Sequence, residues 1–200
     1  MEVGPKKKPF LIHKDLLVFY SDYFRGAFNG SFSEATKGSI YLADERVDVF
    51  TIVNQFVYTR QLSEKLDSDL EWEMLARIWL FGDKYLMPSL QNRVMDMLIE
   101  KNANTGTIPS FLLTITYNNT PPGSPLRKFL TYLVAYKCDP VRDITLELSR
   151  RWPHEALFDL LMVVTAKKQE EIGKFGLPEA NKDRCYYHIH ADGDHCDMKL

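Results

Sequence analysis

The chain has 200 residues, of which 45% are hydrophobic and 12% aromatic, so it contains enough apolar material for a packed core and is not a typical disordered sequence. The formal net charge of -2 offers no general attraction to the phosphate backbone of nucleic acids. Three cysteines are too few for a disulfide framework and indicate a reducing compartment.

The first ten residues, "MEVGPKKKPF", lack the apolar core of a secretory signal, and no apolar run in the chain approaches the roughly 18 residues of a membrane-spanning helix. We therefore expect a soluble intracellular protein, in the cytoplasm or the nucleus, that acts neither in a membrane nor directly on nucleic acid. Lys6–Lys8 are the one basic cluster. They are interpreted either as a nuclear-import signal or as a solvated loop between Pro5 and Pro9.

The region after this loop predicts two short helices and a strand. Residues 13–20 place their leucines at helical spacing, and Ser21 is typical of the N-cap of a second helix over residues 22–28. Asn29-Gly30 ends that helix. The apolar alternation in residues 39–43 predicts a short strand.

Three longer helices follow in the first half of the chain. Residues 47–58 have one apolar face, and residues 70–86 are apolar on most sides, which predicts a largely buried helix. Pro88 suits the first turn of the next helix, which we expect to run to about residue 101. Residues 102–106 are expected to form a loop.

The second half of the chain is also predicted to be helical. We expect a short helical element at 111–115, a turn-rich break at 118–125, and helices at 126–136 and 154–165. From Lys167 onward the apolar periodicity disappears, which indicates a loosely ordered tail.

That tail contains five cysteine and histidine residues: Cys185, His188, His190, His195 and Cys196. Zinc takes four nitrogen or sulfur ligands, and the spacing of Cys185 and His188 suits a first ligand pair. His195 and Cys196 are adjacent, which makes a poor second pair in one tetrahedron. The alternative is a turn at Asp192-Gly193, with Tyr186, Tyr187 and Ile189 packed on the body of the protein.

The sequence offers no catalytic constellation. It contains no G-x-S-x-G elbow to activate Ser21, no phosphate-binding glycine loop and no H-E-x-x-H zinc motif. His13, at the start of a helix, is expected to be a cap or a satisfied buried ring. We therefore expect no catalytic residue and no cofactor.

Residues of the first helical region share their spacing with a known family: Phe10, His13, Leu16, Leu17, Ser21, Tyr23, Phe24 and Phe28. The segments "IYLADE", "VFTIVNQFVYT" and "LARIWLFGDKYLMPSLQNRVMDML" continue the match. Over about residues 3–103 the chain resembles the BTB/POZ domain family, and it is most similar to the stand-alone BTB proteins of filamentous fungi.

This resemblance implies an α+β, mostly α fold, in which a cluster of helices is capped by a small sheet. It implies a BTB/POZ-like domain at residues 1–103, with residues 104–166 as a helical extension and 167–200 as the Cys/His-containing tail. It also implies a protein-interaction module without catalysis, which forms a homodimer or bridges partners to a cullin scaffold of a ubiquitin ligase. The alternative function is a zinc-binding regulatory or transcription-associated protein that uses the tail.

In the adaptor subgroup of the family, a hydrophobic-x-acidic motif reaches the cullin, and Phe32-Ser33-Glu34 matches that pattern. Phe32 and Glu34 are thus candidate partner-binding residues. The alternative is that Phe32 packs on its own domain and Glu34 is only solvated.

The chain departs from the family pattern at its start. Met1-Glu2-Val3 lies within the hairpin that normally follows a first strand, so we expect that strand to be missing or truncated. Because this strand helps to hold the partner in many family dimers, its loss puts the usual dimer in doubt. It also leaves a sheet edge exposed.

Overall fold

The computed structural model describes residues 1–30, 37–63, 70–138, 144–166 and 184–189. The chain divides into two compact units, Met1–Met97 and Leu98–Leu200, which are described separately below. The division falls inside a long helix, α6. The domain limits 1–103, 104–166 and 167–200 remain predictions from the sequence.

Unit 1 contains a small sheet and a cluster of helices. Its elements are β1 (Glu2–Val3), β2 (Lys8–Pro9), α1 (Lys14–Tyr20), α2 (Asp22–Asn29), β3 (Tyr41–Leu42), α4 (Val47–Thr59), α5 (Trp72–Lys84) and the first turns of α6 (Pro88–Thr105). The predicted helices and strand of this region are confirmed, as is Pro88 in the first turn of α6. With the helices that follow, the structure confirms the predicted α+β, mostly α class.

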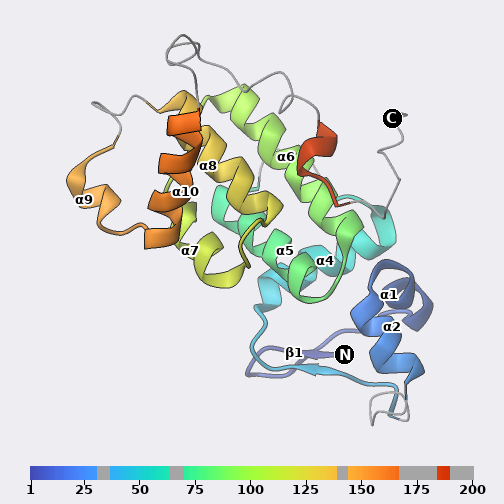
Figure 1. Cartoon of the computed structure of the whole chain (residues 1–200). Helices are drawn as coiled ribbons and strands as arrows, with labels where there is room; N and C mark the ends of the chain where they lie inside the picture. The colour runs from blue at the N-terminus through green and yellow to red at the C-terminus, as the bar shows by residue number, and fades with distance from the viewer. Residues whose placement is uncertain (31–36, 64–69, 139–143, 167–183, 190–200) are drawn as a thin grey trace. The chain divides into compact units, whose positions relative to one another are not determined.

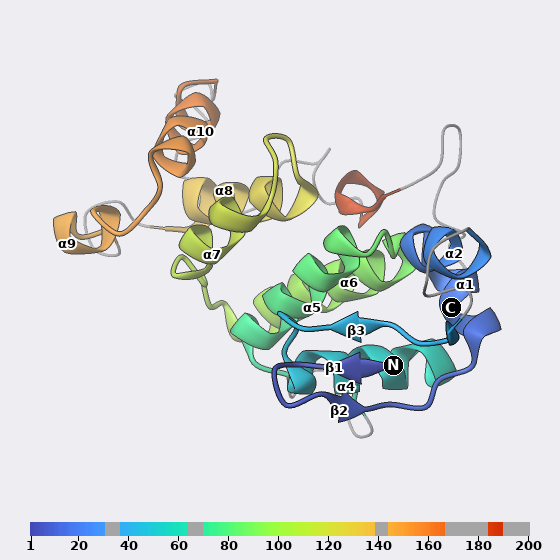
Figure 2. The same cartoon turned by 90° about the horizontal axis from the view of Figure 1, so that it is seen from below.

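The sheet has the strand order β2-β1-β3. β1 and β2 form an antiparallel hairpin with Glu2 opposite Pro9, and β1 pairs in parallel with β3. Figure 2 shows the three strands side by side with α4 along one face. Pro9 lies on an outer strand, where a residue without an N–H group loses no sheet hydrogen bond.

The core of unit 1 is aromatic and lies between the helices and this sheet. Phe24, Phe50 and Trp79 are completely buried. Ser21 caps α2, because its Oγ accepts a hydrogen bond from the Phe24 N–H at 3.1 Å and donates one to the Tyr85 carbonyl at 2.5 Å. The N-cap predicted at Ser21 is therefore confirmed, and its hydroxyl also ties α2 to the end of α5.

Unit 2 is helical in its described residues. After the end of α6 it contains α7 (Leu112–Asn119), α8 (Pro125–Lys137), α9 (Leu146–Ser149), α10 (His154–Ala166) and the 3-10 helix η2 (Arg184–Tyr187). Figure 1 shows α10 and α7 beside α8. Leu126, Phe129 and Leu133 of α8 are completely buried.

Two predicted helix ends are wrong. α6 continues to Thr105 through the segment expected to be a loop, and Gly106 ends it with a φ of 63° and an N–H that donates to the Asn102 carbonyl. α7 continues to Asn119 instead of ending at 115. The prolines that stop a helix come only at 121 and 122, so the asparagines before them remain helical.

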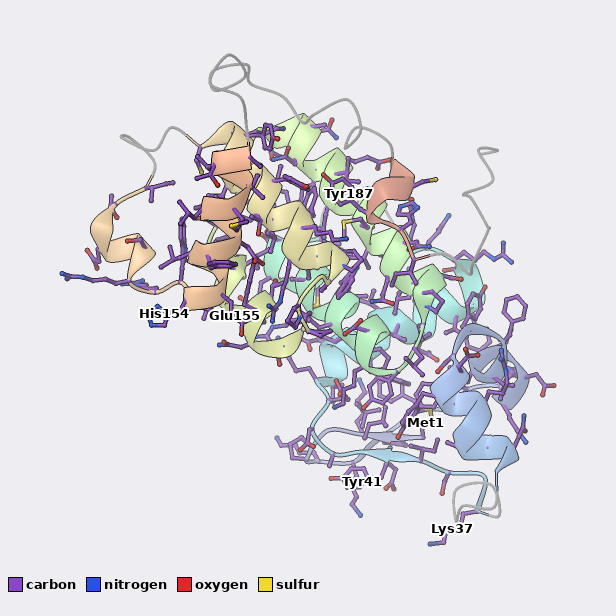
Figure 3. The ribbon with its side chains drawn as sticks, in the orientation of Figure 1. Met1, Lys37, Tyr41, His154, Glu155 and Tyr187 are labelled. Carbon is purple, nitrogen blue, oxygen red and sulfur yellow. The ribbon has the colours of Figure 1, made fainter. Side chains whose placement is uncertain are left out.

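Part of the tail packs on unit 2. The Tyr187 ring is buried and meets the Phe129 ring edge-on, with centroids 5.6 Å apart. Figure 3 labels Tyr187 on η2. This contact confirms the packing predicted for Tyr187. That packing was part of the interpretation in which the tail forms a turn and holds no metal. Within the described ranges, no helix is both long and apolar enough to cross a bilayer.

Candidate protein-interaction surface

Helix α1 buries Leu17 and exposes one large apolar residue, Phe19. Leu17 is completely buried, whereas Phe19, which projects in a different direction two residues later, is 67% exposed. Leu11, in the segment before the helix, is 97% exposed. Side chains this exposed gain little from their own fold, so Leu11 and Phe19 are candidates for contact with another protein.

Contacts with the end of α4 hold these two residues in place. The Tyr58 hydroxyl lies 3.1 Å from the His13 backbone N and 2.8 Å from its Nδ1, which fixes the segment that carries Leu11. Phe19 meets the Tyr20 ring edge-on at 5.0 Å, and Tyr20 in turn accepts a hydrogen bond from Arg60 Nε. Leu11, Phe19 and the half-exposed Tyr58 are called the α1 surface below.

A second exposed apolar pair lies where α5 turns into α6. Leu86 is 53% exposed and has a φ of 50°, a left-handed conformation that costs energy for a leucine. The Leu86 carbonyl accepts the Asp22 N–H, which brings the first turn of α2 to this point. Leu86 and the partly exposed Tyr23 are called the α5–α6 corner.

A buried tyrosine supports this corner. The Tyr85 ring stacks on Phe24 at 5.4 Å and meets the Tyr23 ring edge-on at 5.1 Å. Its hydroxyl donates to Glu45 Oε1 at 2.9 Å. Burial, with a smaller contribution from the Glu45 carboxylate, raises the pKa of Tyr85 well above its ordinary value, so the hydroxyl stays protonated and keeps this bond.

Two pairs of opposite charges lie near the sheet. Lys84 Nζ lies 2.6 Å from Glu45, and Arg46 lies 2.5 Å from Asp48 in a shallow depression lined also by Lys8 and Asp44. The hydrogen bond from Arg46 lowers the pKa of the Asp48 carboxyl. Because both signs of charge meet here, the depression does not favour an ionic ligand of either sign.

The residues considered for catalysis do not meet. Ser21 is buried as a helix cap, whereas His13 is exposed and bonded to Tyr58. His13 holds the N-cap position of α1, as predicted, but its side chain forms no capping bond, and the alternative of a buried ring is wrong because the residue is exposed. The ring turns to Tyr58 instead, because the end of α4 offers a hydroxyl partner.

The other predicted site residues are only partly within the described ranges. Phe32 and Glu34 lie outside them, as do His190, His195 and Cys196. Cys185 and His188 are described, and no group of three metal-ligating side chains occurs among the described residues. The zinc site and the cullin motif therefore remain predictions.

Sequence reasoning did not single out Leu11, Tyr58 or Leu86 as surface residues. Leu11 and Tyr58 lie in segments dense in apolar residues, where the sequence alone does not indicate which side chains are exposed. For Leu86 a weak signal exists, since a tight helix–helix turn of two residues before Pro88 requires an unusual backbone conformation.

The family model described as BTB/POZ domain matches residues 2–102, which include both surfaces defined above. A search among curated proteins found no significant match.

Proposed function

We propose that this chain, which belongs to the BTB/POZ domain family and therefore carries a protein–protein interaction module, self-associates through its α1 surface and brings protein partners together. The proposal assigns no catalytic residue and no cofactor. The intracellular location and the likeness to stand-alone fungal members of the family are part of the same proposal and rest on the sequence.

The observation that carries the proposal is the exposure of Leu11 at 97% and Phe19 at 67% within one domain. Burial of these two side chains against a partner would remove apolar surface from water at about 25 cal/mol for each Å². A second copy of the chain is the simplest partner for the α1 surface, because in a two-fold symmetric dimer the same surface of each copy contacts the other.

Photo-crosslinking tests this assignment. With a benzophenone amino acid in place of Phe19 in the intact chain, we expect a crosslinked product of two chains, joined at residues of the α1 surface. The same group in place of Phe111, an exposed phenylalanine of unit 2, is the matched control and should give little two-chain product. If the benzophenone group at position 19 gave no two-chain product, the proposal of self-association through the α1 surface would be wrong.

The α5–α6 corner favours a second candidate, the cullin adaptor. Leu86 keeps an exposed apolar side chain in a strained backbone conformation, and such strain is typical of positions held for binding. In this proposal Leu86 and Tyr23 contact the scaffold together with Phe32 and Glu34, the residues that match the adaptor motif.

We expect Phe32→Ala combined with Glu34→Ala to weaken cullin capture at least about tenfold, because both anchors of the motif are removed. Pull-down of a cullin by the purified chain measures this, with circular dichroism to confirm that the fold is kept. Lys37→Ala is the control, because Lys37 is an exposed residue just after the motif. Equal capture by the double variant and the unmodified chain would exclude the adaptor role of the motif.

A further inference from the structure

Helix α10 of unit 2 is apolar over most of its surface. From Ala156 to Ala166 it has one charged residue, Asp159. Phe158, Leu161 and Met162 are each more than half exposed, although such side chains are usually inside. Because both its sides are apolar, hydrophobicity alone does not decide which side packs on the unit.

α10 buries its side chains less completely than α8 does, because large residues that face its neighbours, such as Leu157 and Leu160, are only partly buried. Among the residues of α10 only Ala156 is more than nine-tenths buried, whereas α8 buries large side chains such as Phe129 and Leu133 completely. The free energy of opening a segment rises with the apolar surface that opening exposes. Separation of α10 is therefore expected to cost less free energy than separation of α8.

Two carboxylates attach α10 to its neighbours. Glu155 accepts a hydrogen bond from Arg127 Nη1 of α8 at 2.5 Å, and Asp159 accepts one from the Tyr117 hydroxyl of α7 at 2.8 Å. Residues four apart lie on the same side of a helix, so both contacts fix the same orientation of α10. Figure 3 shows Glu155 in the first turn of the helix.

The partners of these carboxylates keep other hydrogen bonds. Arg127 also donates from Nε to the Thr120 hydroxyl at 2.9 Å and from Nη2 to the Tyr117 carbonyl at 2.8 Å. The Tyr117 hydroxyl lies 2.9 Å from Thr131 Oγ1. Separation of α10 thus leaves neither Arg127 nor Tyr117 without a partner, which avoids the usual penalty for an orphaned buried group.

The chain just before α10 is anchored. Trp152 is buried, and the Arg151 carbonyl accepts a hydrogen bond from the Thr114 hydroxyl at 2.9 Å. Pro153 follows, and its carbonyl accepts the first hydrogen bonds of the helix. The start of α10 is therefore fixed to α7, and a pivot at Pro153 moves the helix without moving this anchor.

We propose that Glu155 and Asp159 form a polar latch that holds α10 on α7 and α8, and that α10 undocks about Pro153 as one unit while α7 and α8 stay folded. The latch is a conformational device of unit 2, and it operates whether or not the α1 surface of unit 1 binds a partner.

Hydrogen–deuterium exchange with mass spectrometry on the intact chain tests the latch. In the unmodified protein we expect the amides of α10 to exchange at least about tenfold faster than those of α8. Glu155→Gln and Asp159→Asn keep the side-chain shape but weaken a charge-assisted hydrogen bond. Each should raise the exchange rate of α10 by roughly another threefold to tenfold and leave α8 unchanged.

Glu147→Gln is the matched control, because Glu147 pairs with Arg151 at 3.3 Å with both side chains largely exposed. The Glu147→Gln substitution should leave the amide exchange rate of α10 unchanged. Two results overturn the proposal: exchange of α10 and α8 at one common rate, which means that they open only together, or latch variants in which α10 exchanges no faster than in the control.

Discussion

Replacement of Arg127 by Met is expected to lower the free energy of unfolding of unit 2 by about 3 kcal/mol or more. Arg127 is only 4% exposed, and its guanidinium lies over the Tyr117 ring with 4.3 Å between the Arg127 Cζ and the ring centroid. It donates to the carbonyls of Tyr117 and Thr120, to the Thr120 hydroxyl and to Glu155. Methionine fills similar space but leaves the two carbonyls without these donors.

Urea unfolding of the intact chain, followed by circular dichroism, measures this loss. Lys128→Met is the matched control, because Lys128 is the next residue of α8 and is exposed. It should change the free energy of unfolding by less than about 0.5 kcal/mol. Equal midpoints for the two variants would contradict the structural role given to Arg127.

Phe19→Glu is expected to weaken self-association about a hundredfold, since removal of a central aromatic anchor at an interface costs roughly 2–4 kcal/mol. The new carboxylate would also face its copy across the two-fold axis and lie one helical turn from Asp15, which adds like-charge repulsion. Phe19 is 67% exposed, so the substitution leaves the core of unit 1 intact. Light scattering coupled to size-exclusion chromatography measures the change in mass.

The control for this prediction is Phe111→Glu, which makes the same substitution at an exposed phenylalanine of unit 2. It should leave the mass of the eluted species unchanged. If both variants weakened association equally, the contact would not be specific to α1, and general loss of apolar surface would be the explanation.

The longer helices of this chain could be predicted from the sequence, because apolar spacing and capping are local properties, whereas the short helices α9 and η2 were not predicted. Ser21 shows this well: a serine before an apolar pair at helical spacing indicates an N-cap, and the structure places its Oγ on the Phe24 N–H. The ends of α6 and α7 could not be predicted. Asn102 and Asn119 have weak helix propensity, yet both remain helical, since tertiary contacts outweigh small propensity differences.

The candidate surface was less predictable than the fold. Exposure of Phe19 depends on which side of α1 packs, and a helix of seven residues carries too little pattern to decide this. Burial of Arg127 is equally hidden, because arginine is normally exposed and its acceptors come from α7 and the turn after it. Such networks exist only once the helices are packed.

Sedimentation equilibrium of the unmodified intact chain is the most direct test of the central claim, that an exposed apolar surface on α1 binds a second copy. The account predicts a species of twice the chain mass of 23.2 kDa at the higher concentrations, which dissociates on dilution. A mass of one chain at every concentration would contradict it.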